Sequence, residues 1–428
     1  MKLYVAKKVI DHSVTVRASG AKNALLHLMF ATLLPNDATE LTNVPTALDD
    51  FHGANNILTY LGATTQVDEA DEKVVIQKPT MDRHGLDIPL SLTRQTRCSL
   101  MLLGSLVKQV GTLTIGYPGG CAFSDRRPFD IHLDGLDALG AEVCVQQDTI
   151  RVTHQQDQDA TYRLRCPSVG ATINLLLYST IGQATVTLTN IAIEPEVMSV
   201  IEYLQQCGAQ IQVSTANRWV QVVGVNQLKG ISFPIMYDRI QTMTFAAFAY
   251  LHRCLVTIEG IDDLTPIQGP LNVLSQAGGR WRYDPIKQSL FCDGQQTSLQ
   301  GIKIQAAPYP AFPTDLQPIY AVMLSQANTP SYIQDTVYPE RVKYIDELKK
   351  MGFPAQVNEQ TIYIRPLKTT QLAAAHMQSH DLRAGMACLM AGSLVEATSQ
   401  VTHARQIFRG YNHLLTTMQH FMLLDKDD

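Results

Sequence analysis

A cysteine in a Gly/Pro-rich segment is the side chain of this sequence best placed to do chemistry. Cys121 follows Pro118-Gly119-Gly120, and Arg126 and Arg127 stand five and six residues after it. Neighbouring cations lower the pKa of a thiol and favour the thiolate, and guanidinium groups also bind carboxylates and phosphates. Residues 117–128 are therefore predicted to form a lid that brings an acid or a nucleophile to an anionic substrate. The alternative is a surface loop whose cysteine does no chemistry.

Four cations stand where apolar, helix-like segments begin: Lys22, Arg97, Arg239 and Arg383. A cation is unfavourable there, because the amino end of a helix already carries the positive end of its macrodipole. A bound anion would offset the repulsion, and the amides of a helix start attract anions themselves. Ser168 and Asp381 stand at similar positions but need no ligand, since Ser and Asp cap helices. The four cations predict a site for an anionic substrate.

Asp315 is the best candidate for a general base. It follows Ala311-Phe312-Pro313-Thr314, which predicts a rigid turn before a helix. A carboxylate among cations stays ionised and can accept a proton, although a helix cap would explain the same residue. Arg409, followed by Gly410-Tyr411, is either a further anion contact or a solvated arginine.

An internal repeat positions these residues. Apolar helical segments recur roughly every 70 residues, and they begin near Asn23, Ser99, Thr172, Thr244, Gln317 and Gly385. Their nearly continuous apolarity predicts helices that are buried on most sides. Strands rich in β-branched residues follow several of them, as at 112–115, 185–188 and 255–258.

A second, amphipathic helix is expected to close each unit and to end at a glycine. The predicted stop residues are Gly62, Gly140, Gly208, Gly278 and Gly352, and because the sixth unit has no glycine near residue 420, an incomplete last unit is expected. Six units divide into two domains of three, with a boundary near Phe233-Pro234. The buried helices of each trio should pack together with the sheets outside them.

Composition excludes several classes of protein. The 428 residues carry 34 Lys and Arg against 39 Asp and Glu, and the net charge of -5 gives no reason to expect nucleic acid or an anionic membrane as a partner. No apolar run approaches a membrane span, and no signal peptide is predicted. The eight cysteines form no CxxC pair, so neither a zinc site nor a disulfide framework is predicted, and we expect a cytoplasmic protein.

The ordered set of short motifs resembles the enolpyruvyltransferases, and within them the branch that acts on a nucleotide sugar. The resemblance covers essentially the whole chain. The segments that support it are Ser19-Gly20-Ala21-Lys22-Asn23-Ala24, Pro118-Gly119-Gly120-Cys121, Arg127-Pro128 with Asp130 and His132, Ser168-Val169-Gly170-Ala171-Thr172, Glu194-Pro195-Glu196, Asp238-Arg239-Ile240, Phe312-Pro313-Thr314-Asp315, Asp381-Leu382-Arg383 and Arg409-Gly410-Tyr411. The shikimate branch of the family has serines around its lysine and lacks the lid cysteine.

The resemblance implies a reaction and a role for each candidate. The enolpyruvyl group of phosphoenolpyruvate would pass to the 3-hydroxyl of UDP-N-acetylglucosamine. Cys121 would be the general acid for the methylene carbon and the residue that forms adducts with phosphoenolpyruvate or fosfomycin, and Asp315 would take the proton of the hydroxyl. The other implied contacts are Lys22, Arg97, Arg409 and Arg126 or Arg127 to phosphoenolpyruvate, Asn23 to the sugar, Ser168, Val169, Gly170, Thr336 and Val337 to the uridine diphosphate, and Asp381 and Arg383 in the closed site. No metal and no cofactor is implied.

The fold implied is a two-domain α/β architecture, the inside-out α/β barrel, with three repeats of a βαβαββ-type unit in each domain and buried central helices. Residues 1–21 with 236–428 would form one domain. Residues 22–235 would form the other, which carries the lid 117–128. The active site is expected in the cleft between them.

Some positions depart from the family pattern. The lid has one extra residue before Arg127-Pro128, Cys166 replaces a lysine, Ile193 a basic residue, Gln241 a glutamate and Asn412 a glutamate. Two alternatives therefore stay open: transfer to a different nucleotide sugar, and a paralogue that binds a UDP-sugar without catalysis.

Overall fold

The computed structural model describes residues 1–10, 13–81, 84–119, 129–367 and 371–427. They form two compact units, and the chain passes from one to the other at 19–20 and at 236–237. Unit 1 consists of residues 1–19 and 237–428, and unit 2 of residues 20–236 apart from the segment around residues 120–128. No helix of the described residues is long and apolar enough to cross a membrane.

In unit 2 the strands form three four-stranded sheets with one shared order. Within each sheet the first two strands run parallel and the other neighbours antiparallel. The sheets are β14 (Ser232–Pro234), β3 (Thr39–Thr42), β5 (Lys73–Gln77), β4 (Thr64–Asp68); β6 (Leu86–Ile88), β7 (Thr112–Gly116), β9 (Thr149–His154), β8 (Ala141–Val145); and β10 (Ala160–Arg163), β11 (Thr185–Thr189), β13 (Trp219–Val223), β12 (Gln210–Ser214).

In unit 1 the same order returns in three further sheets. They are β2 (Ser13–Arg17), β15 (Leu255–Glu259), β17 (Ser289–Asp293), β16 (Arg280–Asp284); β18 (Lys303–Ala306), β19 (Ser331–Asp335), β21 (Thr361–Ile364), β20 (Ala355–Asn358); and β22 (His376–Gln378), β23 (Ser399–Thr402), β1 (Lys2–Lys7), β24 (Met422–Asp427). A parallel pair needs a crossover. A buried helix provides it between β6 and β7, β10 and β11, β18 and β19, and β22 and β23, whereas β14 and β2 reach their parallel partners across a whole unit of the chain.

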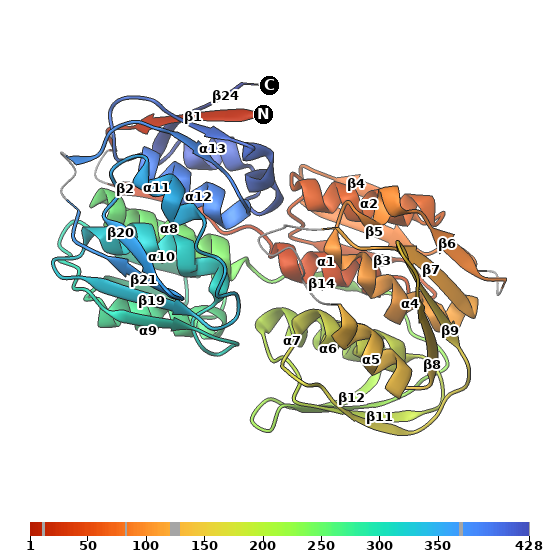
Figure 1. Ribbon diagram of the computed structural model, residues 1–428. Coiled ribbons are helices and arrows are strands. Elements are labelled where there is room, and N and C mark those ends of the chain that lie inside the picture. The colour runs from red at the N-terminus through yellow and green to blue at the C-terminus, as the bar shows by residue number, and fades with distance from the viewer. Residues whose placement is uncertain (11–12, 82–83, 120–128, 368–370, 428) are drawn as a thin grey trace. The chain divides into compact units, whose positions relative to one another are not determined.

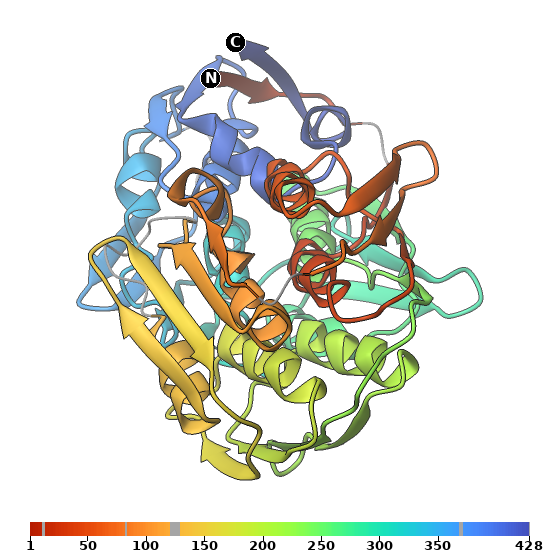
Figure 2. The same cartoon turned by 90° about the vertical axis from the view of Figure 1, so that its right-hand side faces the viewer.

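The buried helices lie at the centre of each unit, as predicted. Figure 1 shows α8, α10 and α12 side by side within unit 1, and Figure 2 shows the strands of unit 2 outside its helices. In α8 every residue from Arg239 to Leu251 is buried, which agrees with its continuous apolarity. The buried helices are α1 (Lys22–Ala31), α4 (Met101–Val110), α6 (Val169–Thr180), α8 (Arg239–His252), α10 (Gln317–Met323) and α12 (Leu382–Gly392).

The second helices pack beside the buried ones, as α5 does against α6 and α11 against α12, and the predicted glycine stops are confirmed. Gly62 and Gly278 have φ of +85° and +84°, in the region where a side chain is strained, so glycine ends the helix before each of them. The second helices are α2 (Asp49–Tyr60), α5 (Asp130–Ala138), α7 (Pro195–Gln206), α9 (Gln268–Gln276), α11 (Tyr344–Lys349) and α13 (Leu414–Met418). The short helices are α3 (Leu90–Thr93), η1 (Arg97–Leu100), η2 (Thr265–Ile267), η3 (Thr314–Leu316), η4 (Leu324–Gln326) and η6 (Ala404–Arg409).

The expectation of an incomplete sixth unit is wrong. Its fourth strand is supplied by β1 from the beginning of the chain, where Leu3 pairs with Val401 on one side and with Lys426 on the other. In the same way β2 completes the fourth unit and β14 the first. The missing glycine near residue 420 therefore marks a different turn and not a truncated repeat.

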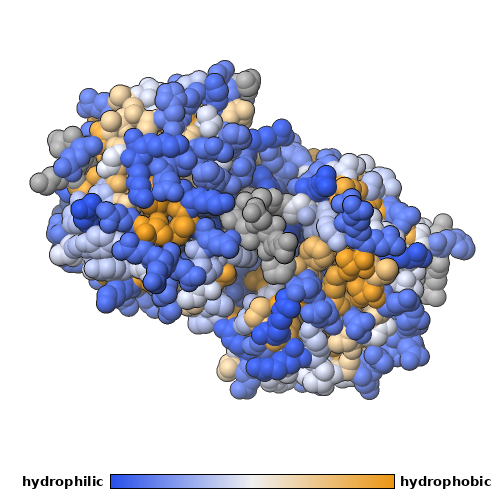
Figure 3. All heavy atoms as spheres, in the orientation of Figure 1, coloured by the Kyte–Doolittle hydropathy of each residue, from blue (hydrophilic) through white to orange (hydrophobic). Residues whose placement is uncertain are grey.

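The surface offers no continuous apolar face in the view of Figure 3, where hydrophobic residues form small groups among hydrophilic ones. The most exposed large hydrophobic residues, Ile286 and Val9, lie in separate segments outside the helices and strands. Isolated exposed apolar residues of this kind are ordinary in globular proteins.

Candidate active site

Lys22 stands at the first residue of α1 because of a close backbone approach just before it. A Cβ on Gly20 would lie 1.8 Å from the carbonyl oxygen of Asn43, so only glycine fits this turn. The Ala21 amide donates to the carbonyl of Met236 at 2.7 Å, and Ala21 offers α1 no side-chain cap. The start of α1 is thus fixed by the backbone, and it carries an ammonium where a capping oxygen is more usual.

The Lys22 ammonium has a buried carboxylate beside it. Its Nζ lies 2.8 Å from Oδ2 of Asp50, and the two side chains are 11% and 4% exposed. Asp50 stands in the first turn of α2, where a negative charge is favourable. The sequence analysis missed Asp50, because an acid at a helix start is explained by the macrodipole alone.

Arg97 begins η1, as its predicted place before the second buried helix requires. Thr96 precedes it as the N-cap, and its hydroxyl accepts from the Cys98 amide at 3.3 Å. Burial, followed by the negative charge of Asp50, raises the pKa of the Cys98 thiol to about 11. Arg97, Cys98, Lys22 and Asp50 thus interact in one cluster, in which Cys98 stays a neutral thiol.

The third helix start of unit 2 is built around Ser168. The Ser168 hydroxyl accepts from the Ala171 amide at 3.4 Å and caps α6, which begins with Val169 and Gly170. Gly170 lies against the ring of His132, and a Cβ there would approach His132 Cε1 to 3.0 Å. Burial lowers the pKa of His132 to about 3, with a further contribution from Arg97, so this imidazole is neutral near pH 7.

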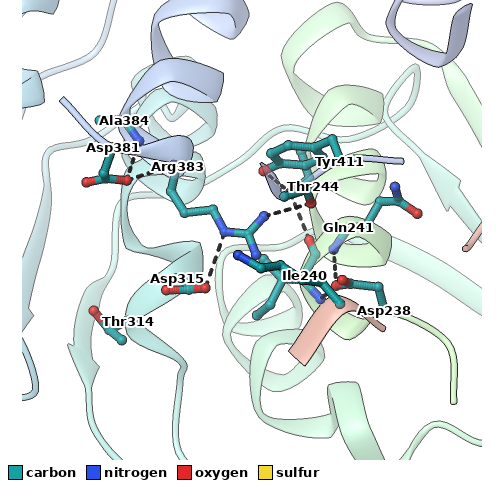
Figure 4. A network of polar contacts seen from close by, with 12 residues as sticks. Asp238, Ile240, Gln241, Thr244, Thr314, Asp315, Asp381, Arg383, Ala384 and Tyr411 are labelled. Atoms are coloured by element: carbon teal, nitrogen blue, oxygen red, sulfur yellow. Dashed lines mark hydrogen bonds and ion pairs between the residues drawn. The ribbon is translucent and has the colours of Figure 1, made fainter. Parts of the chain in front are cut away.

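In unit 1 the predicted base, Asp315, lies between two arginines. Its Oδ1 is 2.8 Å from Nη1 of Arg341, and its Oδ2 is 3.3 Å from Nε of Arg383. Both guanidinium groups are nearly buried, at 2% and 1% exposed, whereas the carboxylate is 26% exposed. Figure 4 shows Arg383 reaching toward Asp315 from α12.

Arg341 is the residue that the sequence analysis missed in this cluster. It also donates to the carbonyl and hydroxyl oxygens of Thr314, at 2.9 and 3.2 Å, and its Nε lies 3.7 Å from Asp381 Oδ2. Burial would lower the pKa of Arg341, but Asp315 and Asp381 outweigh it and raise the pKa. No motif marks Arg341, because it stands outside every helix start, in the segment that follows β19.

Arg383 is fixed by three further contacts. Asp381 caps α12, since its Oδ1 accepts from the amides of Arg383 and Ala384 at 2.7 and 3.1 Å. The guanidinium lies 5.0 Å from the ring centroid of Tyr411 and donates to the carbonyl of Gly410 at 3.4 Å. Tyr411 also contacts Thr244 through its hydroxyl, at 3.2 Å (Figure 4). Arg383 is therefore held rigidly, and it can orient the Asp315 carboxylate.

The other candidates of unit 1 lie at the ends of helices and strands. Thr336 and Val337 follow β19, where the Thr336 hydroxyl donates to the Ala306 carbonyl at 2.7 Å and the Val337 amide to Asp335 Oδ1 at 2.9 Å. Arg239 begins α8 and lies 5.9 Å from the ring of Tyr309. Arg409 ends η6 and is partly exposed. Cys121, Arg126 and Arg127 lie outside the described residues.

A polar hollow of about 460 Å³ in unit 2 lies away from these clusters, at the carboxyl ends of α1, α4 and α6. Lys78 donates there to the carbonyl of Leu34 and to Gln109, and Lys108 to the carbonyl of Ile181 and to Asp157. Both lysines therefore stabilise carboxyl ends of helices, where a cation is favourable, and the hollow needs no ligand to explain them.

Each unit thus gathers polar or charged side chains at the amino ends of its buried helices. In unit 1 they include a carboxylate between arginines, and in unit 2 cations with the carboxylate of Asp50. Residues 7–418 match the family model of EPSP synthase (3-phosphoshikimate 1-carboxyvinyltransferase). The UDP-N-acetylglucosamine 1-carboxyvinyltransferase of Desulfosudis oleivorans is 31% identical over 400 residues, which cover 94% of this chain and 93% of that protein. The protein of that name in Prosthecochloris aestuarii is 31% identical over 409 residues, covering 95% and 93%. The chain belongs to this family of enolpyruvyltransferases.

Solved structures share the fold of this enolpyruvyltransferase. The enolpyruvyl transferase NikO of Streptomyces tendae aligns with a TM-score of 0.87 over 99% of this chain and 98% of its own, at 20% identity. An EPSP synthase of Acinetobacter baumannii aligns with a TM-score of 0.73 over 99% and 100%, at 16% identity. At these identities the likeness shows the fold alone, and it confirms the predicted α/β architecture.

The positions at which this enolpyruvyltransferase departs from the family pattern differ in their surroundings. Gln241 is buried, and its Oε1 accepts from both the amide and the hydroxyl of Ser19 at 2.9 Å, so the amide supplies the acceptor oxygen that a glutamate would. Ile193 and Asn412 are buried as well. Cys166 is an exposed free thiol, and its neighbour Arg165 pairs with Asp130 at 2.5 Å and with Asp134 at 3.7 Å.

Proposed function

We propose that this enzyme transfers the enolpyruvyl group of phosphoenolpyruvate to the 3-hydroxyl of UDP-N-acetylglucosamine and releases phosphate, the first committed step of peptidoglycan synthesis. Relatives named for this activity align with more than nine tenths of the chain. The observation that carries the proposal is Asp315, a partly exposed carboxylate held by two buried arginines. Two fixed guanidinium groups favour the ionised carboxylate, which is the form that can act as a base.

The first half of the reaction joins the two substrates. The acceptor hydroxyl gives its proton to Asp315, and its oxygen forms a bond to C2 of the enol phosphate. The C2–C3 electron pair takes a proton at C3, and Cys121 is the proposed donor. The product is a tetrahedral adduct that still carries the phosphate, now on an sp³ carbon.

The second half restores the double bond. The bond between C2 and the phosphate oxygen breaks, and the phosphate leaves with the electron pair and with the proton that Asp315 had taken from the hydroxyl. C3 then loses a proton. Cys121 is the proposed acceptor of that proton, so the thiol returns to its starting state. Positioned acids and bases of this kind accelerate such steps by about 10² to 10⁴.

The cations serve the anionic substrate in this proposal. Lys22, Arg97 and Arg409, with Arg126 or Arg127, hold phosphoenolpyruvate, and the backbone amides at the start of α1 add to their field. Arg383 and Arg341 serve the acceptor side of the reaction, because both hold Asp315, the proposed base for the acceptor hydroxyl. Asp381 caps α12 by accepting from the backbone amide of Arg383, and it therefore positions the base indirectly, through Arg383.

The acceptor is proposed to lie along the remaining candidates. Ser168 uses its hydroxyl as a cap, so the amides of Val169 and Gly170, in the first turn of α6, are the groups left to bind the diphosphate. The Val337 amide is occupied by Asp335, so Val337 would contact the uridine through other atoms, and Thr336 holds this turn in place. Asn23 is proposed to bind the sugar.

The two units act as the domains of the enzyme in this account, and turnover needs groups from both. We expect the reaction in the cytoplasm, because the seven cysteines of the described residues are free thiols, as in a reducing compartment. Fosfomycin would alkylate Cys121, which intact-protein mass spectrometry would detect as an adduct absent from Cys121→Ala.

An acceptor panel tests the assignment and its alternatives. Phosphate release from phosphoenolpyruvate is measured with UDP-N-acetylglucosamine, with UDP-glucose and with no acceptor. Release that occurs with UDP-N-acetylglucosamine but not in the other two mixtures supports the proposal. Faster release with another nucleotide sugar would reassign the acceptor. Binding of UDP-N-acetylglucosamine without release would identify a binding protein. The contacts of Gln241 do not favour that last outcome, since the acceptor oxygen that Ser19 needs is present.

A further inference from the structure

The carboxylate beside Lys22 has no part in the reaction described above. Asp50 lies 2.8 Å from the Lys22 ammonium, and its side chain is 4% exposed. The two charges interact differently with the helix macrodipoles. The negative charge of Asp50 is favourable in the first turn of α2, whereas the positive charge of Lys22 is unfavourable at the first residue of α1. The carboxylate therefore compensates for the poor placement of the ammonium.

The helix that carries Asp50 also lies beside the segment of the second cation of unit 2. Helix α2 packs against the segment before Arg97: a Cβ on Gly53 would lie 3.2 Å from Cβ of Gln95, and Asn56 Nδ2 donates to Gln95 Oε1 at 3.1 Å. Asp50 and Arg97 both act on the Cys98 thiol, which stays neutral because its pKa is about 11. With one negative and two positive groups, the cluster of Lys22, Arg97, Asp50 and Cys98 has a net charge of +1 instead of +2.

This arrangement sets two negative groups close together once an anion binds. A phosphate oxygen in a charge-assisted hydrogen bond lies about 2.8 Å from an ammonium nitrogen. Adding the 2.8 Å between Lys22 and Asp50, that oxygen can lie at most about 6 Å from the Asp50 carboxylate. Like charges at such distances repel appreciably in a partly buried site.

We propose that Asp50 is a resident counter-ion of the anion site, which holds the Lys22 ammonium before substrate arrives and then opposes the anion, so that it sets the affinity for phosphoenolpyruvate and favours release of phosphate. This inference rests on the proposed function, in which Lys22 binds phosphoenolpyruvate. Asp50 acts through Lys22 and is a positioning residue.

Titration calorimetry with inorganic phosphate tests the counter-ion directly. Asp50→Asn removes the charge and keeps an oxygen that can accept from Lys22, and Asp50→Ser does the same with a smaller side chain, so either folded variant decides the question. Both should bind phosphate about tenfold more tightly than the wild type. Asp50→Glu, which keeps the charge, should bind within about threefold of the wild type. Asp71→Asn, at the exposed pair with Lys73, is the matched control and should change nothing.

Steady-state kinetics supply a second measurement that a merely structural role would not produce. In the neutral variants the KM for phosphoenolpyruvate and the inhibition constant of phosphate should fall by the same factor, while the KM for the acceptor stays unchanged. Phosphate binding that is equal or weaker in the folded neutral variants would overturn the inference. A wild type that binds neither phosphate nor phosphoenolpyruvate would instead contradict the proposed function.

Discussion

The two charged clusters of this enzyme stand at equivalent places of the same repeat, yet they are built in opposite ways. In unit 1 the carboxylate of Asp315 is held by two nearly buried arginines. Asp381 contacts both arginines, and the ring of Tyr411 lies against Arg383. In unit 2 the cation Lys22 pairs with the carboxylate of Asp50. The comparison teaches that the fold supplies helix starts, whereas the residues at those starts decide between the proposed base of unit 1 and the proposed anion site of unit 2.

The surroundings of the two clusters differ in rigidity as well. The guanidinium of Arg383 is held by a carboxylate, a carbonyl and an aromatic ring, so it has little freedom to follow a ligand. The Lys22 ammonium pairs with the Asp50 carboxylate at 2.8 Å, and a phosphate can share this ion pair. A base must keep its orientation through the reaction, whereas an anion site must release its product.

Removing the base should break the unit 1 cluster most completely. Asp315→Asn keeps the shape of the carboxylate but cannot take the proton of the acceptor, so kcat should fall by about 10³. Phosphate release from phosphoenolpyruvate measures the effect. Binding of UDP-N-acetylglucosamine should persist, and a kcat within tenfold of the wild type would rule out Asp315 as the base.

Removing the ammonium of unit 2 should act on binding of phosphoenolpyruvate. Lys22→Met loses a charge-assisted contact, so kcat/KM for this substrate should fall by about 10². The single change leaves Asp50 buried with its charge, so Lys22→Met/Asp50→Asn is the control for stability. If the double variant recovered full kcat/KM, the ammonium would have no role in binding.

A milder change in unit 1 tests whether orientation of the base matters. Arg341→Lys keeps a positive charge but cannot reach Asp315, Thr314 and Asp381 together, so kcat should fall by about tenfold. The acid limb of the kcat profile should move to higher pH, because the ionised carboxylate loses part of its stabilisation. An unchanged profile with reduced kcat would point to a general packing defect.

The last effect concerns stability and not turnover, and it comes from the neutral imidazole of unit 2. His132 has a pKa of about 3 in the fold, and an unfolded histidine has one near 6.5, so only the unfolded chain takes up a proton between these values. The free energy of unfolding should therefore fall as pH is lowered through this window, by about 1.4 kcal/mol per pH unit for this group.

Urea unfolding between pH 6 and pH 4.5 checks this contribution. In His132→Gln the free energy of unfolding should fall less steeply with falling pH, and the slope should decrease by the contribution of about one proton. The exposed His403, changed to Gln, is the control and should leave the slope as it is. An equal slope in wild type and His132→Gln would mean that His132 already takes up its proton within the fold.

The sequence predicted the repeat because its signals are local. Continuous apolarity marks a helix that is buried on all sides, as in α8, and a glycine marks a backbone that needs positive φ, as at Gly62. Such local signals could not predict that β1, β2 and β14 complete sheets of units that are distant in the sequence. Leu3 pairs with Val401 and Lys426 across almost the whole chain, and strand pairing over that distance depends on register and not on local pattern.

Candidate site residues could be picked from the sequence where a residue stands out against its local context. Lys22, Arg97 and Arg383 oppose the macrodipole at helix starts, and Asp315 follows a turn with two prolines nearby. Arg341 and Asp50 could not be found in this way. The first stands in an irregular segment, and the second suits the helix start it occupies, so their roles depend on which elements the fold brings beside them.

The most direct test of the account is phosphate release from phosphoenolpyruvate by the wild type and by Cys121→Ala, with and without UDP-N-acetylglucosamine. The account predicts release by the wild type when both substrates are present, and loss of release when either the acceptor or the thiol is removed. Release that continues without the acceptor or in Cys121→Ala at the wild-type rate would contradict it.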